Sequence, residues 1–240
     1  PRPGVTVSPT DIERYRTCPL AYRFARVDRV PQRPSTARAI GVAAHAALEA
    51  HHRPDGPGGD ADSLVARFAR ELVRAGVANT PEGRQALERA REWMPKYHER
   101  TRRQERRTVA VERPFTLTLG PHVVRGRIDR LDAHPGGGHQ IVDYKTGRPP
   151  SAGAPTDSLV LHIYMAGAYE SFEATPKGAT LEYVLDGDLR QVNPDPREVR
   201  AALEEARDVA DRISAGEYPA APGWACRSCD FALICPAMDR

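Results

Sequence analysis

The 240-residue sequence lacks several features that would assign it to other classes of protein. It contains no run of about 18 apolar residues, so we expect no membrane-spanning helix. Its first residues, PRPGVTVSP, lack the basic and apolar segments of an export signal, which predicts a cytoplasmic protein. No phosphate-loop motif G-x-x-x-x-G-K-[ST] is present, so the chain itself carries no such nucleotide-driven motor. Without an initiator Met, Pro1 begins either a processed chain or a domain of something longer.

Lysine is scarce, because only three of the 35 basic residues are lysines (Lys96, Lys145 and Lys177). The resulting arginine bias indicates a bacterial genome of high GC content, and it makes a lysine at a motif position worth attention. The net charge of +3 is too small for a histone-like binder. The basic segment 98–107 is typical of the solvated face of a helix, with phosphate contact as the alternative.

The periodicity of the sequence changes near residue 106. Helix signals precede that point, and strand-like alternation and turn residues follow it. Ser8 and Asp195 each begin a helix-capping pattern, and Pro95 should kink or split its helix. We expect helices and strands in this order: helices from 8 to 18, 36–52, 61–77 and 82–105, strands 108–119, 122–132 and 139–145, a helix 157–174, strands 179–185 and 188–192, and a helix from 195.

This order predicts an α/β fold with a mixed central sheet flanked by helices. We divide the chain into three regions. A helical region covers 1–105, a sheet-containing core covers 106–194, and a C-terminal helix with a cysteine-rich tail covers 195–240.

Two strand segments carry carboxylates and a lysine, GRIDRLD at 126–132 and IVDYKTG at 141–147. Asp143 and Lys145 are two apart on a strand and should share one face, and a hairpin would bring Asp129 beside Asp143. Converging carboxylates favour a hard divalent cation such as magnesium or manganese. The alternative is a surface hairpin with solvated charges. The apolar neighbours Ile128 and Val142 argue against it, because unpaired charge is costly among apolar groups.

These two segments resemble the signature of RecB-type nucleases in the PD-(D/E)XK superfamily, which implies a restriction-endonuclease-like core. The resemblance implies that Asp129 and Asp143 bind metal with help from the Tyr144 backbone carbonyl, and that Lys145 is catalytic. The pattern G-x-x-x-H from Gly41 to His45 matches the family's metal-binding histidine.

One family motif is altered. The family's Q-x-x-x-Y pattern reads Val160 to Tyr164 in this chain, so Tyr164 retains its implied catalytic role while the glutamine is replaced. His162 is a candidate substitute for that glutamine. Glu112 is a weaker candidate. We interpret it instead as a solvated strand residue.

The four cysteines form an uneven pattern, with Cys18 alone and three others within ten residues: Cys226, Cys229 and Cys235. Without an export signal, shared metal ligation explains them better than disulfides, and by ligand count zinc and iron–sulfur are equally suitable. Cys18-Pro19 together with C-x-x-C-x5-C-P is similar to the iron–sulfur staple of the same nuclease lineage. That resemblance implies a 4Fe-4S cluster which joins the two ends of the chain.

The predicted function is a Mg- or Mn-dependent deoxyribonuclease, in particular an exonuclease that acts on single-stranded DNA ends or flaps in DNA repair or recombination. Three alternatives stay open. The chain could be the nuclease domain of a helicase–nuclease that needs its motor in cis or in trans, a non-cleaving iron–sulfur DNA-binding module, or a CRISPR-adaptation nuclease.

Overall fold

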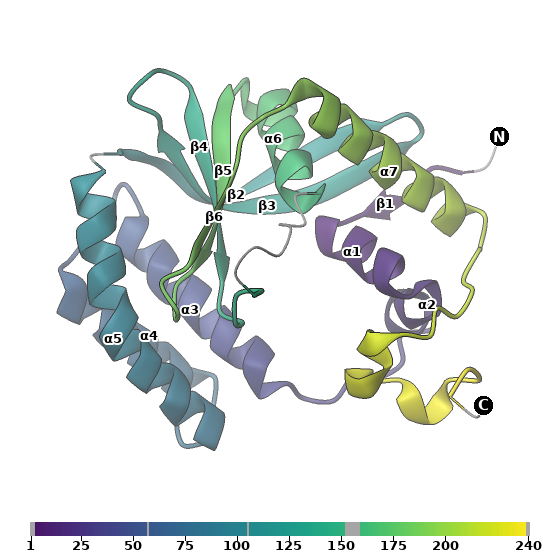
Figure 1. Cartoon of the computed structure of the whole chain (residues 1–240), viewed down its shortest axis with the longest axis horizontal. Coiled ribbons are helices and arrows are strands. Elements are labelled where there is room, and N and C mark those ends of the chain that lie inside the picture. Colours follow the sequence, from purple (N-terminus) through teal and green to yellow (C-terminus); the bar gives the residue numbers. More distant parts are fainter. Residues whose placement is uncertain (1–2, 57, 105, 152–158, 239–240) are drawn as a thin grey trace.

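The computed structural model describes residues 3–56, 58–104, 106–151 and 159–238, which form a mixed sheet with helices on both faces (Figure 1). The α-helices are α1 (Pro9–Thr17), α2 (Pro19–Arg26), α3 (Thr36–His52), α4 (Ala61–Arg74), α5 (Pro81–Arg103), α6 (Leu159–Phe172) and α7 (Pro196–Ser214). The strands are β1 (Thr6–Val7), β2 (Thr108–Leu119), β3 (His122–Ala133), β4 (His139–Lys145), β5 (Pro176–Tyr183) and β6 (Leu189–Val192). Two short 3-10 helices, η1 (Trp224–Ser228) and η2 (Ala232–Ile234), lie in the C-terminal tail.

Strand β3 is the centre of the sheet and has a divided edge. It pairs antiparallel with β2 along most of its length. Its other edge is therefore shared by β1, which pairs in parallel with residues 123–124, and by β4, which pairs antiparallel with residues 130–133. Strand β5 continues the sheet in parallel with β4, and β6 pairs antiparallel with β5. Asp129 thus lies in the fork between β1 and β4.

Each face of the sheet has its own hydrophobic core. One core joins β1, α1, α6 and α7 to sheet residues such as Ile128 and Ile141. The other joins α3, α4 and α5 to Val142 and Tyr144. Neighbouring residues of β4 therefore belong to opposite cores, as the two-residue period of a strand requires. Figure 1 shows α3, α4 and α5 together on one side of the sheet, with α1, α6 and α7 on the other.

Both capping patterns that the sequence predicts are present. The Ser8 hydroxyl accepts a hydrogen bond from the Asp11 amide at 3.1 Å, and the Asp11 carboxylate accepts one from the Ser8 amide at 3.0 Å. The Asp195 side chain accepts from the Arg197 amide at 2.8 Å and begins α7.

Some boundaries differ from the predicted ones. Helix α5 runs through Pro95 without being split, since the buried side chains of Met94 and Tyr97 on either side hold the helix against the core. Helix α2 and strand β1 were not predicted from the sequence, and β5 begins three residues earlier than predicted. The predicted helix limits at residues 105 and 157 lie outside the described residues. Within the described ranges, no helix combines the length and apolarity needed to cross a membrane.

Candidate metal centre

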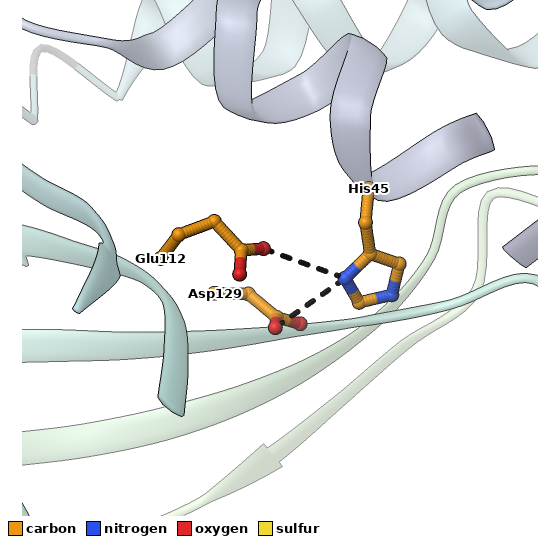
Figure 2. A group of neighbouring side chains, drawn as sticks. All are labelled: His45, Glu112 and Asp129. Carbon is orange, nitrogen blue, oxygen red and sulfur yellow. Dashed lines mark ion pairs between the residues drawn. The ribbon is translucent and has the colours of Figure 1, made fainter. Parts of the chain in front are cut away.

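His45, Glu112 and Asp129 come together from three different elements, α3, β2 and β3 (Figure 2). The His45 Nδ1 atom lies 3.4 Å from Asp129 Oδ1 and 3.8 Å from Glu112 Oε1. One potential ligand atom from each side chain lies within 4.8 Å of the other two. Among the described residues, this is the one group of three or more His, Cys, Asp or Glu side chains that meets that distance.

Local backbone features hold the two carboxylates in place. Asp129 lies in the fork of the sheet, and its Oδ2 atom accepts a hydrogen bond from the Tyr144 amide of β4 at 2.7 Å. Glu112 lies within β2 but has a left-handed backbone, at a φ of 47°. A residue other than glycine adopts this conformation at a cost, and such strain is concentrated at functional sites.

Charge complementarity stabilises the group. Burial lowers the pKa of His45, but hydrogen bonds with the carboxylates of Asp129 and Glu112 outweigh it and raise that pKa to about 10. Burial raises the pKa of Glu112, whereas His45 and Arg127 lower it, and the net shift is downward. A protonated imidazole therefore lies beside the side chains of Glu112 and Asp129. Carboxylate oxygens are suitable donors for Mg²⁺ or Mn²⁺, and an imidazole nitrogen is a common ligand of divalent transition metals, so this set of residues fits a divalent cation.

Asp143 and Lys145 form a second pair on the neighbouring strand β4. The Lys145 Nζ atom lies 2.7 Å from Asp143 Oδ2, and only 5% of the Asp143 side chain is exposed. Burial raises the pKa of Asp143, and Lys145 only partly opposes this effect. Burial lowers the pKa of Lys145, but the adjacent Asp143 raises it by more than burial lowers it. The net shift is upward, so Lys145 stays a cation.

Tyr164 extends from α6 toward the same carboxylates. Burial, followed by the charges of Asp143 and Asp129, raises the pKa of its hydroxyl well above the ordinary value. Phe115 packs edge-on against its ring, with 5.7 Å between the ring centroids. The hydroxyl therefore stays protonated and is able to donate a hydrogen bond within the site.

His162 does not take the place of the missing glutamine. It is buried, and its Nε2 atom lies 3.6 Å from Glu198 of α7. Two residues along a helix are rotated by about 200°, so His162 and Val160 point in different directions. The buried Val160 supplies no polar group.

Glu112 belongs to the candidate metal site, although its sequence position predicted a solvated strand residue. Only 19% of its side chain is exposed, so it is not a solvated strand residue. The interpretation is wrong because alternation along β2 gives no hint of the left-handed turn at this position. An acidic residue opposite Asp129 on an adjacent strand is the signal that could have identified it.

An open cavity of about 550 Å³ lies beside this group. His45 and Glu112 line it, together with the arginines Arg38 and Arg127. Arg127 Nη1 lies 3.1 Å from Glu112 Oε2, and 64% of its side chain is exposed. The cavity thus combines candidate metal ligands with accessible cations, which suits a substrate that carries phosphate groups.

The four cysteines line a single separate cavity of about 190 Å³: Cys18, Cys226, Cys229 and Cys235. Cys18 lies between α1 and α2, and the other three belong to the tail with η1 and η2. The described cysteines do not bring three sulfur atoms within 4.8 Å of one another. Four thiolates around one zinc ion at about 2.3 Å would stand closer than that, so this spacing is not that of a closed zinc site.

Comparisons with known proteins agree with this architecture. The family model of the PD-(D/E)XK nuclease superfamily matches residues 6–236. The Gene 69 protein of Mycobacterium phage D29 is 29% identical over 271 residues, which cover 96% of this chain and 96% of the phage protein. A solved structure titled "Putative exonuclease" from Eubacterium rectale has a TM-score of 0.57 and 14% identity, covering 93% of this chain and 86% of that one. That structural likeness shows a common fold.

Proposed function

Because the chain belongs to the PD-(D/E)XK nuclease superfamily, we propose that it is a metal-dependent deoxyribonuclease of the RecB-like type. One observation carries the proposal. The triad of His45, Glu112 and Asp129 lies beside the buried Asp143 and its partner Lys145, at the point where β3 parts from β4. Carboxylates, an imidazole and a lysine in one place are the groups that phosphodiester hydrolysis needs.

Metal binding is assigned to His45, Asp129, Asp143 and the backbone carbonyl of Tyr144, with Glu112 as a further ligand. A divalent cation, when bound, makes a water molecule more acidic and neutralises charge on the scissile phosphate. The protonated His45 must lose its proton before Nδ1 can serve as a ligand.

Lys145 and Tyr164 act on the substrate from the Asp143 side of the site. The Lys145 ammonium would offset the negative charge that grows on the phosphate oxygens in the transition state. The Tyr164 hydroxyl, which stays protonated, would hold the attacked strand by donating a hydrogen bond. Arg38 and Arg127 would contact neighbouring phosphates along the cavity.

We propose single-stranded DNA ends as the substrate and exonucleolytic cutting in repair as the mode of action. The open cavity beside the triad is consistent with a flexible single strand, and its two arginines suit backbone phosphates. The similar structure from Eubacterium rectale, described as that of a "Putative exonuclease", is consistent with this mode.

A 4Fe-4S cluster held by the four cysteines is the second part of the proposal. The cysteines share one cavity, and the Gly223 amide lies 3.4 Å from Cys226 Sγ, as a donor to a cluster thiolate would. The thiolates of a four-iron cluster bind different irons, so they need not approach one another as zinc ligands do. Such a cluster would tie the tail to the α1–α2 junction.

Digestion of end-labelled single-stranded DNA by anaerobically purified protein, with Mn²⁺ or with chelator, tests the nuclease assignment. We expect Mn²⁺-dependent release of label by wild type and no release by Asp143→Ala or Lys145→Ala. Lys177→Ala is the matched control, because Lys177 is an exposed lysine outside the site and should leave cleavage unchanged. Equal cleavage by wild type and Lys145→Ala would refute the assignment. Iron and sulfide analysis of the same preparation tests the cluster.

A further inference from the structure

Arg130 is an arginine buried inside the protein, with a relative exposure of 2%. It directly follows Asp129 on β3, and its side chain enters the core that faces α3 and α5. Its Nε atom donates to Asp132 Oδ2 at 3.1 Å, and its Nη2 atom lies 3.0 Å from the same oxygen. This ion pair satisfies one side of the guanidinium.

The remaining side of the guanidinium contacts three other elements. Arg130 Nη1 lies 2.6 Å from the Tyr97 hydroxyl, 2.9 Å from the Tyr144 hydroxyl and 3.0 Å from His52 Nε2. These residues belong to α5, β4 and α3, respectively. One planar group therefore joins β3 to three neighbouring elements, which suits the fixed fork of arginine and not the single ammonium of lysine.

Two of those elements carry candidate metal ligands. Tyr144 separates Asp143 from Lys145, and its own amide donates to Asp129. His52 lies seven residues after His45 on α3, on the same stripe of that helix. The two strands and the helix that supply Asp129, Asp143 and His45 are thus all held by contacts that converge on one guanidinium.

We propose that Arg130 is a positioning residue that sets the spacing of the metal ligands by joining β3, β4 and α3. This inference depends on the proposed metal-dependent function. Stability alone would not require an arginine at this position, since well-packed apolar residues often replace buried ion pairs without loss of stability.

Mn²⁺ binding, followed by electron paramagnetic resonance of the free ion, tests the inference in the full chain. Tyr144→Phe removes one hydroxyl from the Arg130 network and keeps the Tyr144 backbone, and Arg130→Lys keeps the charge without the fork. We expect both variants to bind Mn²⁺ about tenfold more weakly than wild type, as removal of ligand-orienting residues typically does. Saturating Mn²⁺ should restore their cleavage rate.

The matched control is Leu72→Ala, because Leu72 is a fully buried residue of the same core, on α4, outside the Arg130 network. It should lower the melting temperature and leave Mn²⁺ affinity unchanged. Wild-type affinity in Tyr144→Phe, or an equal loss in Leu72→Ala, would overturn the inference. A wild-type protein that binds Mn²⁺ but cuts no DNA would refute the nuclease proposal, and the binding data would still decide the role of Arg130. Absence of Mn²⁺ binding by wild type overturns both.

Discussion

Replacing Glu112 with glycine should weaken Mn²⁺ binding while leaving the free energy of unfolding nearly unchanged. The left-handed backbone at Glu112, with a φ of 47°, costs a residue other than glycine about 1–2 kcal/mol. Glycine relieves this strain but loses about 0.5–1 kcal/mol through its more flexible unfolded state. The ion pairs with Arg127, whose side chain is 64% exposed, and with His45 at 3.8 Å together contribute about 1 kcal/mol. The three effects largely cancel, so we expect a stability within about 1 kcal/mol of wild type.

Metal binding should respond very differently to the same substitution. Glu112→Gly removes one of the two carboxylates that lie within 4 Å of His45 Nδ1. Loss of a residue that only orients a metal ligand typically costs about 10–100-fold in affinity. We therefore expect Mn²⁺ to bind at least about tenfold more weakly, with a matching rise in the Mn²⁺ concentration needed for half-maximal cleavage.

Urea denaturation without metal measures the first effect, and Mn²⁺ titration measures the second. Glu173→Gly is the matched control, because the exposed Glu173 has nearly the same backbone, a φ of 53°, in the turn between α6 and β5. It should gain about 0.5–1 kcal/mol of stability from the same cancellation of strain and entropy, with unchanged Mn²⁺ affinity. Wild-type Mn²⁺ affinity in Glu112→Gly would refute Glu112 as a ligand. A stability loss above about 2 kcal/mol would refute the strain argument.

Three further predictions concern pH, packing and the cysteines. Burial, with help from His98 and Arg67, lowers the pKa of His51 to about 4, so between about pH 6.5 and pH 4 only the unfolded chain holds this proton. Stability should fall as pH falls through that window, and His51→Asn should flatten the fall in urea titrations at several pH values. Gly167→Ala would place a methyl group 2.2 Å from the Phe115 ring that packs on Tyr164; we expect a loss of about 1–3 kcal/mol in thermal denaturation and slower cleavage at saturating Mn²⁺. Cys226→Ser should remove iron from the purified protein and lower its melting temperature, whereas unchanged iron content would contradict a four-cysteine cluster.

The order of elements could largely be predicted from the sequence because local rules decide it. Ser8 and Asp195 cap helices through atoms two or three residues away, so their patterns are visible in the chain itself. The segment from His139 to Lys145 is bounded by glycines, and its successive side chains pack into two different cores. Its sequence therefore predicts a strand. Helix α2 was missed because only Cys18 separates α1 from Pro19, and a proline there can end one helix or begin the next.

That Asp143 and Lys145 share a face follows from the chain alone, since the two-residue period of a strand leaves no other arrangement. Which side chains complete the site depends on the packing of the whole fold. Glu112 lies near His45 at the left-handed backbone position within β2. His162 faces Glu198 because α6 packs against α7. The contacts of Arg130 with Tyr97 and His52 join residues 33 and 78 positions away in the chain. Such contacts follow from how the sheet and helices pack, which no local pattern encodes.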